Sequence, residues 1–474
     1  MTKTSIDLSR RKALQAAAGL SGVVAGAVSL SALAATGAKG QAKGGAGAQA
    51  GTLAPVTDLA PRPPMGWNSW NSFAGTINEE QCLETAAIMA EKLLPFGYDV
   101  FTVDIQWYEP DATSYSYNPN PVPALDAHAR LQPAPNRFPS AREGQGFAPL
   151  AAKVHALGLK FGIHVMRGIA RHAVKLDLPI EGTPYTARDI ADTSSVCPWN
   201  PDMYGVDMTR PGAQEYYDGL FRMYASWGVD FIKMDDMSRP YDAHAPEIEA
   251  AAKAIARCGR PMVLSLSPGE TPVPRGGHVR QHAQMWRISD DFWDDWGLLA
   301  AQFTRLENWN MWMGPGSWPD ADMLPLGRLA LGDRDTKFTP DEQATLMTLW
   351  SIARSPLIMG GDLRYLDAAT LALLTNPEVL GVNQNSTANA PHFLEDGLKV
   401  WTARDERGFA IYLALFNLAP EAREVSVPLD RVGLVGSFVL RDLWERQDRG
   451  DVKGAVSAQL PGHGAKLYKL TPLV

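Results

Sequence analysis

The chain has few of the features that metal, redox or nucleic-acid chemistry requires. Its 474 residues include three cysteines, Cys82, Cys197 and Cys258, and none stands at CxxC or zinc-ligand spacing. At most one disulfide can form within the chain, and free buried thiols are an equal expectation. The net charge is −8, with no basic run beyond the first few residues, which argues against nucleic-acid binding. We expect no metal site and no cofactor.

Residues 1–34 predict an export signal of the twin-arginine type. Arg10 and Arg11 lie in the pattern Ser-Arg-Arg-Lys-Ala-Leu, and the apolar run Ala16–Leu33 that follows is short for a membrane span and broken by glycines. An uncleaved N-terminal membrane anchor is the alternative. We expect export to the periplasm or the medium, no stable membrane insertion after cleavage, and a flexible linker over 35–61.

The rest of the chain has ordinary globular composition, with 45% hydrophobic and 20% charged residues, which suffices for more than one domain. Tryptophan is abundant, at 14 residues. Tryptophan rings fill cores, and they also stack on the faces of sugars. Nothing in the sequence indicates an oligomeric state.

From about residue 62 a unit repeats: an amphipathic segment, a glycine suited to a left-handed helix C-cap, and a short apolar strand with a polar end. The predicted helices are Glu79–Phe96, preceded by a capping box over Thr76–Glu79, Phe147–Leu157, Ala213–Trp227 and Pro246–Cys258. The predicted strands are Met65–Trp70, Tyr98–Asp104, Leu159–Val165, Val229–Asp235, Met262–Ser267, Gln284–Ser289, Trp309–Pro315 and Pro356–Met359. This alternation over 62–385 predicts an α/β fold, a (β/α)₈ TIM barrel. A doubly wound open sheet is the alternative, but no glycine-rich dinucleotide fingerprint supports it.

The pattern changes after Asn385. Short alternating segments separated by turns predict strands and no long helix. These segments are Phe393–Trp401, Phe409–Phe416, Val425–Pro428, Ser437–Leu443 and Leu467–Leu470. Residues 386–474 therefore predict a small C-terminal antiparallel β-sandwich.

The strand Val229–Asp235 carries the most informative polar end. Side chains alternate along a strand, so Lys233 and Asp235 point the same way and Asp236 points the other. In a barrel, the carboxyl end of a parallel strand is where catalytic groups lie. The lysine is expected to keep Asp235 ionised, as a nucleophilic carboxylate requires. A purely structural ion pair is the alternative.

Other strand ends repeat this acidic character. Asp104 ends the second strand, and acidic residues follow the sixth and seventh strands at Asp290, Asp291, Asp320 and Asp322. Aromatic residues lie nearby, and these are Trp70, Trp107, Trp199, Trp286 and Trp318. Acidic and aromatic residues without a metal cluster indicate a sugar site, because two carboxylates cleave a glycosidic bond without a cofactor.

Several motifs, in order and spacing, resemble glycoside hydrolase family 27, which includes α-galactosidases and β-L-arabinopyranosidases. They are Pro-Pro-Met-Gly-Trp-Asn-Ser-Trp at 63–70, Lys-Met-Asp at 233–235, Trp286-Arg287 followed by Asp291, and Trp-Pro-Asp-Ala-Asp-Met-Leu at 318–324. Ser-Pro-Leu-Ile-Met at 355–359 and Asn383-Gln384 are further landmarks. The resemblance covers about residues 63–385, and the C-terminal sandwich is also a family feature.

The resemblance implies a role for each matching residue. Asp235 is similar to the nucleophile of a retaining mechanism, and Asp291 to the general acid/base, with Asp290 as the competitor for that second role. The family motif places the acid/base four residues after the arginine, which favours Asp291. The sugar-binding positions implied are Trp70, Asp104, Lys233, Arg287 and Asp322. Trp67, Trp286 and Trp318 are as much expected in the core as in contact with the sugar. For Asp320, capping or turning a loop is the alternative role.

The sequence departs from the α-galactosidase pattern at one end of the site. Those enzymes carry two adjacent aspartates after the second strand, whereas Asp104 is followed here by Ile105 and Gln106. Gln106 is a candidate replacement contact to the sugar. The strand ends at 164–168 and 265–269, together with Cys-Pro-Trp199, resemble a divergent branch of the family with both activities.

The sequence therefore predicts an exported retaining exo-glycosidase that removes terminal α-D-galactosyl units from a carbohydrate substrate. A β-L-arabinopyranosidase, or an exo-enzyme for another sugar, is the alternative within the enzymes. β-L-Arabinopyranose has the ring configuration of α-D-galactopyranose without the CH₂OH group. A non-catalytic glycan-binding protein on a hydrolase scaffold is the alternative from another class.

Overall fold

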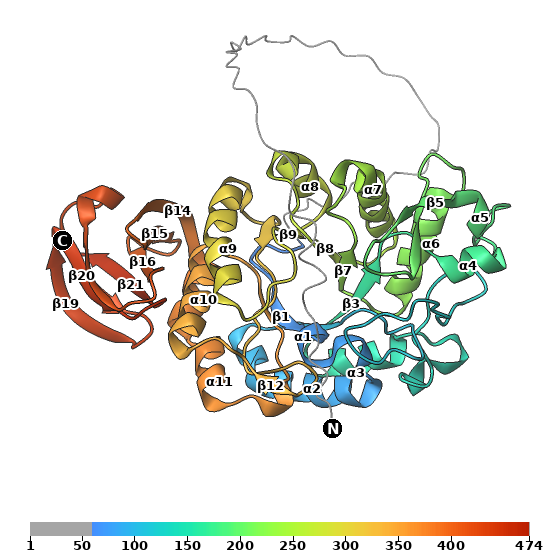
Figure 1. Ribbon diagram of the computed structural model, residues 1–474, viewed down its shortest axis with the longest axis horizontal. Helices are drawn as coiled ribbons and strands as arrows, with labels where there is room; N and C mark the ends of the chain where they lie inside the picture. Colours follow the sequence, from blue (N-terminus) through green and yellow to red (C-terminus); the bar gives the residue numbers. More distant parts are fainter. Residues whose placement is uncertain (1–58, 474) are drawn as a thin grey trace, which may run out of the picture. The chain divides into compact units, whose positions relative to one another are not determined.

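The computed structural model describes residues 59–473 (Figure 1). The predicted export signal over 1–34 and nearly all of the predicted linker over 35–61 lie outside the described residues. Within the described part, no helix is long and apolar enough to cross a membrane, and no group of His, Cys, Asp or Glu side chains could hold a metal ion. Cys82, Cys197 and Cys258 are all free thiols.

A parallel sheet of eight strands forms the centre of the first domain. Its spatial order is β10-β9-β8-β7-β3-β2-β1-β13. The strands are β1 (Met65–Asn68), β2 (Val100–Val103), β3 (Lys160–Met166), β7 (Phe231–Asp235), β8 (Val263–Leu266), β9 (Met285–Arg287), β10 (Trp318–Asp320) and β13 (Leu357–Met359). Just beyond β10, the amide of Leu324 donates to the carbonyl of Ile358 at 2.8 Å, so the two edges of the sheet meet. The predicted (β/α)₈ barrel is confirmed.

Helices follow most of the barrel strands and cover the sheet (Figure 1). They are α2 (Glu79–Lys92), α3 (Ala148–Ala156), α6 (Ala213–Ser226), α7 (Tyr241–Arg257), α8 (Gly276–His282), α9 (Trp296–Trp309), α10 (Pro340–Ile352), α11 (Ala368–Thr375) and α12 (Pro377–Asn385). The predicted glycines after the first four helices all have positive φ, from 81° to 98°. A residue with a Cβ is strained in that conformation, so each glycine favours a sharp exit into the next strand.

Two local predictions for the barrel were wrong. Trp309–Pro315 is not a strand, because α9 runs to Trp309 and a 3₁₀ turn follows; the seventh strand is β10. Buried Leu299, Phe303 and Leu306 form the apolar stripe of α9 at helical spacing. The capping box of α2 uses Asn78 and Gln81 rather than Thr76 and Glu79. The Thr76 hydroxyl instead donates to the carbonyl of Phe73 at 2.7 Å.

An excursion between β3 and α6 builds a small three-stranded antiparallel sheet in the order β4-β6-β5. Its strands are β4 (Ile169–Ala170), β5 (Ala191–Val196) and β6 (Met203–Val206), with α4 (Arg171–Leu176) and α5 (Ala187–Ile190) between them. Elsewhere α1 (Trp70–Phe73) follows β1, and β11 (Arg328–Leu329) pairs with β12 (Arg334–Asp335).

The C-terminal domain is the predicted antiparallel β-sandwich. A six-stranded sheet has the order β14-β15-β16-β21-β18-β19, and β17 pairs with β20. The strands are β14 (Ser386–Glu395), β15 (Leu398–Asp405), β16 (Ile411–Asn417), β17 (Arg423–Pro428), β18 (Ser437–Asp442), β19 (Gln447–Lys453), β20 (Ala455–Leu460) and β21 (Ala465–Pro472). Asp396 and Gly397, both with positive φ, divide the predicted strand Phe393–Trp401 between β14 and β15. Val400, Leu413, Val427 and Val456 lie in the core between the sheets.

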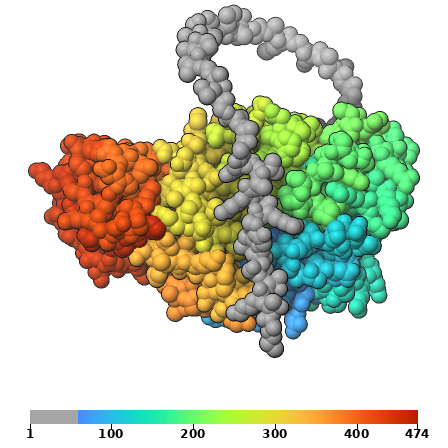
Figure 2. Space-filling view, viewed as in Figure 1, coloured from blue at the N-terminus to red at the C-terminus, as the bar shows by residue number. Residues whose placement is uncertain are grey.

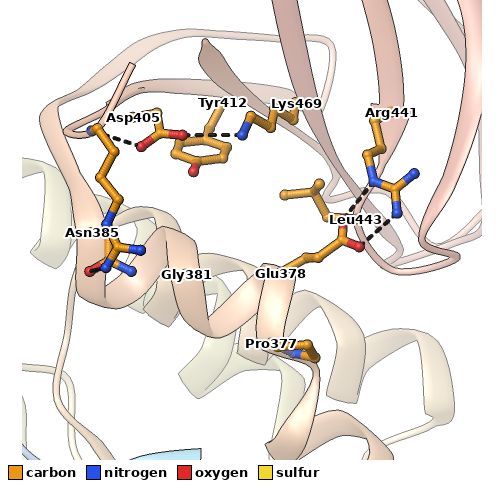
Figure 3. Close-up of a pocket in the computed structure, with 10 residues that line it drawn as sticks. Pro377, Glu378, Gly381, Asn385, Asp405, Tyr412, Arg441, Leu443 and Lys469 are labelled. Atoms are coloured by element: carbon orange, nitrogen blue, oxygen red, sulfur yellow. Dashed lines mark hydrogen bonds and ion pairs between the residues drawn. The ribbon is translucent and has the colours of Figure 1, made fainter. Parts of the chain in front are cut away.

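The sandwich packs on α10 and α12 of the barrel, and Figure 2 shows its red surface against the yellow and orange part of the chain. A polar pocket of about 340 Å³ lies at this junction (Figure 3). Ion pairs line it: Arg441 with Glu378 at 2.8 Å and Lys469 with Asp405 at 3.1 Å. None of the predicted sugar-binding residues lines this pocket. The pair of Arg441 with Glu378 joins β18 to α12 of the barrel, whereas Lys469 and Asp405 both belong to the sandwich.

Candidate active site

Asp235, the last residue of β7, is buried and held on both carboxylate oxygens. His164 Nε2 lies 2.9 Å from Oδ2, and the Ser267 hydroxyl donates to Oδ1 at 2.9 Å. Burial opposes ionisation of Asp235, but the hydrogen bond and charge of His164, and then the charge of Lys233, outweigh burial and lower its pKa. Asp235 is therefore an oriented carboxylate that is ionised at neutral pH.

Lys233 lies on the same strand, but its ammonium pairs with Asp104. Lys233 Nζ donates to Asp104 Oδ2 at 2.8 Å, and Asn68 Nδ2 donates to the same oxygen at 2.7 Å. Burial opposes ionisation of Asp104, but the charge and hydrogen bond of Lys233, together with the charge of His164 and the amide of Ile105, outweigh burial and lower its pKa to about 2. The expectation that Lys233 keeps Asp235 ionised is confirmed only as a weaker contribution, because His164 acts on Asp235 more strongly.

Replacing Asp104 with asparagine is expected to lower the free energy of unfolding at pH 7 by about 3–5 kcal/mol, because Lys233 stays buried without its counter-ion. The folded-state pKa of Asp104 is depressed to about 2, so its contribution is present above the unfolded pKa near 4 and is lost as pH falls toward 2. Denaturant titrations at pH 7 and pH 3 measure both effects. The difference in free energy of unfolding between wild type and variant is expected to be smaller at pH 3 than at pH 7.

Asp99→Asn is the matched control, because Asp99 pairs with Lys160 on the surface, where the lysine side chain is 57% exposed. Its loss is expected to cost about 1 kcal/mol or less. Equal destabilisation by the two substitutions would contradict a special role for the Asp104–Lys233 pair.

Two strands along the sheet from β7, Arg287 at the end of β9 organises two further carboxylates. Its Nη1 lies 2.8 Å from Asp322 Oδ1, and its Nη2 lies 3.5 Å from Asp291 Oδ1. The amide of Phe292, next to Asp291, donates to Asp322 Oδ2 at 2.7 Å. Side-chain and backbone contacts therefore both anchor the segment that carries Asp291.

The two neighbouring aspartates at 290 and 291 have different surroundings. The Asp290 side chain is 66% exposed and pairs with Arg239, away from Arg287. The Asp291 side chain is 26% exposed and faces Arg287. This geometry favours Asp291 as the group that meets both a bound molecule and solvent, and its assignment as acid/base remains a prediction.

Asp320 ends β10, in register with Arg287 on the neighbouring β9, and its electrostatics are unusual. Burial, and then the charge of Asp322, raise the pKa of Asp320 to about 7. Its Oδ1 accepts a hydrogen bond from the amide of Asp322 at 2.9 Å, consistent with the predicted role in a turn. Asp322 has φ of 84°, outside the usual range for a residue with a Cβ, and this strain lies at the candidate site.

Aromatic rings extend from Trp70 to Trp199. The Trp70 ring is parallel to Tyr117 at a centroid distance of 6.4 Å, and Tyr117 meets Trp199 at 5.8 Å. Tyr115 contacts Trp70 edge-on at 5.2 Å. Trp70 and Trp199 therefore belong to one aromatic group, as a stacking surface requires. The four remaining tryptophans are fully buried in the barrel, and these are Trp67, Trp107, Trp286 and Trp318.

Gln106 lies beside these groups but is itself almost fully buried. Its Nε2 donates to Asp202 Oδ2 at 3.4 Å, and the Tyr108 hydroxyl donates to the same oxygen at 2.5 Å. Burial raises the pKa of Asp202. Gln106 thus joins the loop after β2 to the excursion that carries Trp199.

Sequence reasoning missed the two residues that orient Asp235, and it also missed Asn68, Tyr115, Tyr117 and Asp202. His164 and Ser267 belong to strand ends that looked only like departures from a family pattern. A usable signal existed: His164 and Met166 stand two apart at the end of β3, where alternate residues point into the barrel. Asn68 and Asp202 left no such signal, because they approach Asp104 and Gln106 only in the folded chain.

The arrangement provides two carboxylates with different properties. Asp235 is fixed, ionised and nearly inaccessible, whereas Asp291 is partly exposed beside an arginine. A fixed carboxylate suits nucleophilic attack, and a partly exposed one suits proton exchange with water. Lys233, Arg287 and Asp104 add hydrogen-bond donors and acceptors around them.

Known proteins resemble the chain in sequence and in fold. A family model described as "Alpha galactosidase A" matches residues 202–385, and one described as "Alpha galactosidase C-terminal beta sandwich domain" matches residues 395–470. A solved GH27 β-L-arabinopyranosidase from Geobacillus stearothermophilus is 50% identical, with a TM-score of 0.87, over 88% of this chain and 98% of that chain. Alpha-galactosidase 2 of Arabidopsis thaliana is 28% identical over 87% of this chain and 90% of that protein. An α-galactosidase of Coffea arabica is 29% identical over 86% and 94%.

Proposed function

The chain belongs to glycoside hydrolase family 27 and is a glycoside hydrolase of the α-galactosidase type, and on this premise we propose that it releases terminal α-D-galactosyl residues by a retaining, double-displacement mechanism. The observation that carries the proposed mechanism is the state of Asp235, which is buried and oriented by His164 and Ser267 with its pKa lowered. Such a carboxylate loses little freedom when it attacks carbon.

In the first step, an oxygen of Asp235 bonds to the anomeric carbon as the bond to the leaving oxygen breaks, and Asp291 gives its proton to that oxygen. In the second step, Asp291 takes a proton from water, the water oxygen bonds to the same carbon, and the ester bond to Asp235 breaks. Two inversions leave the anomeric configuration unchanged. No cofactor takes part in either step.

The other groups bind the sugar in this proposal. Lys233 and Arg287 donate hydrogen bonds to ring hydroxyls, Asp104 and Asp322 accept them, and Trp70 stacks on the ring. The charged side chains among these groups are already paired with one another, Lys233 with Asp104 and Arg287 with Asp322. Preorganised groups of this kind need little rearrangement when substrate arrives.

A second candidate activity is hydrolysis of β-L-arabinopyranosides, and two observations favour it. The β-L-arabinopyranosidase from Geobacillus stearothermophilus shares half of its residues with this chain. Beside Asp104, the buried apolar Ile105 stands where the α-galactosidase pattern has a second aspartate. An apolar side chain there cannot bind a C6 hydroxyl, so a sugar without CH₂OH loses no contact.

Measuring kcat/KM for an aryl α-D-galactopyranoside and an aryl β-L-arabinopyranoside side by side distinguishes the two activities. Ile105→Asp is expected to raise the galactoside-to-arabinoside ratio by at least about tenfold, because a hydrogen bond between a charged carboxylate and the C6 hydroxyl contributes about 1.5–3 kcal/mol. Ile105→Val is the control and is expected to keep the wild-type ratio. An unchanged ratio in Ile105→Asp would show that residue 105 does not determine specificity. If the wild type hydrolyses neither sugar, the proposed substrates are wrong.

We further propose that the protein is exported by the twin-arginine route and works in the periplasm or the medium. The support is the Arg10-Arg11 pattern and the apolar run that follows it. The N-terminal residue of the protein recovered from a producing cell's periplasm or medium tests this proposal, and recovery of the intact chain in the cytoplasm alone would contradict it.

A further inference from the structure

The residue after Asp235 has an unusual backbone. Asp236 has φ of 64°, in the left-handed region, although its side chain carries a Cβ. This conformation costs on the order of 1–2 kcal/mol for such a residue. The peptide that joins Asp235 to Asp236 therefore needs outside contacts to keep its position, and Arg167 supplies them.

Arg167 follows β3 and contacts both residues of the pair. Its amide donates to the carbonyl of Asp235 at 2.9 Å. Its guanidinium Nε donates to the carbonyl and the carboxylate of Asp236, each at 3.1 Å, and Nη2 donates to the same carboxylate at 2.8 Å. The Arg167 side chain is only 2% exposed, so these contacts are shielded from water.

The remaining guanidinium nitrogen faces Glu247 of α7. Arg167 Nη1 lies 2.6 Å from Glu247 Oε1, while Glu247 Oε2 accepts from the Tyr217 hydroxyl at 2.6 Å and from the amide of Val206 at 3.2 Å. All of these groups are buried. Glu247 thus fixes the rotation of the guanidinium and ties it to β6 through Val206.

The fit around Arg167 is tight on the side of β6. A Cβ added to Gly205 would lie 2.7 Å from Arg167 Nη1, so only a glycine allows this approach. β6 belongs to the same excursion as Trp199 and Asp202. Arg167 therefore contacts the peptide of the predicted nucleophile on one side and the predicted sugar-contacting excursion on the other.

We propose that Arg167 is a positioning residue for Asp235: by holding the Asp235–Asp236 peptide against β6, it sets the distance between the nucleophile and the bound sugar. This inference rests on the proposed function, because it assumes that Asp235 attacks the anomeric carbon. Arg167 itself touches neither the substrate nor the reacting atoms. Its planar fork binds several acceptors at once, which the single ammonium of lysine cannot do.

The test compares kcat and KM of Arg167→Lys, Arg171→Lys and Asp235→Asn on the aryl glycoside that the wild type hydrolyses faster. Arg167→Lys is expected to lower kcat by about 10- to 100-fold, because small misplacements of reacting groups have effects of that size, with KM within about threefold. Arg171 is the matched control, since it lies within the excursion and its Nε donates to the carbonyl of Met203 at 2.9 Å without contacting Asp235 or Asp236.

For Arg167→Lys we also expect a melting temperature close to that of the wild type and unchanged inhibition by the free product sugar. These two results distinguish loss of positioning from loss of stability or of the binding site. If Asp235→Asn is inactive and Arg167→Lys behaves like Arg171→Lys, the positioning inference is wrong. If Asp235→Asn retains wild-type activity, the proposed function itself is wrong. If Arg167→Lys does not fold, Glu247→Gln replaces it in the test, because it keeps the arginine but removes the charge that fixes the guanidinium. An unchanged kcat in Glu247→Gln would overturn the inference.

Discussion

Replacing Asp235 with asparagine is expected to lower kcat/KM by on the order of 10⁴-fold or more, as removal of a catalytic nucleophile does in other enzymes. The amide keeps the size of the carboxylate and can still accept a hydrogen bond from Ser267, so the fold survives while nucleophilicity is lost. The measurement is hydrolysis of an aryl glycoside by the purified variant, with product release followed over hours.

The same substrate incubated with the wild-type enzyme, with NMR detection, identifies the anomer released first. A retained configuration agrees with Asp235 as nucleophile, and an inverted product would exclude that role. Asp290→Asn is the matched control because it removes a carboxylate that is 66% exposed and lies away from Arg287. Its kcat/KM is expected to stay within about twofold of wild type.

Replacing Asp291 with asparagine is expected to lower kcat by about 10²- to 10⁴-fold on a substrate with a poor leaving group, the usual contribution of a general acid/base. On a dinitrophenyl glycoside the first step needs no proton, so kcat/KM is expected to fall much less, whereas kcat stays low because the second step still lacks its general base. Added azide, which attacks the glycosyl-enzyme without base assistance, is expected to restore turnover and yield a glycosyl azide.

The pair of variants at 290 and 291 also decides which aspartate is the acid/base. A large loss in Asp290→Asn with little loss in Asp291→Asn would reverse the assignment. The larger loss of activity is expected in Asp291→Asn, because Arg287 reaches Asp291 whereas Asp290 pairs with Arg239. A pH–rate profile of Asp291→Asn that has lost its alkaline limb would add independent support.

The barrel was predictable because its signals are local. Each predicted helix ends at a glycine that adopts positive φ, and each of seven predicted strands overlaps an observed strand. The strand at Val229–Asp235 could be read in detail, since side-chain alternation alone predicts that Lys233 and Asp235 share a face. The segment at 309–315 was misread because its apolar residues fit the end of a helix as well as a short strand.

The partners of the catalytic candidates were harder to predict. Asp235 is contacted by His164 from β3 and Ser267 after β8, which lie 71 and 32 residues away in sequence. Arg167 and Glu247 are 80 residues apart and meet behind the same aspartate. No local pattern specifies such pairs, because sheet order and the close packing at Gly205 bring them together.

The sequence by itself determined the elements and the types of group at their ends: alternating helices and strands, a later run of short strands, and carboxylates after β2, β7, β9 and β10. These follow from periodicity and turn residues, which act over a few positions. Only the tertiary structure decided which charges pair, placing Lys233 on Asp104, His164 on Asp235, Arg287 on Asp322 and Asp290 on Arg239. Pairing depends on distance and burial, and both arise when the barrel closes.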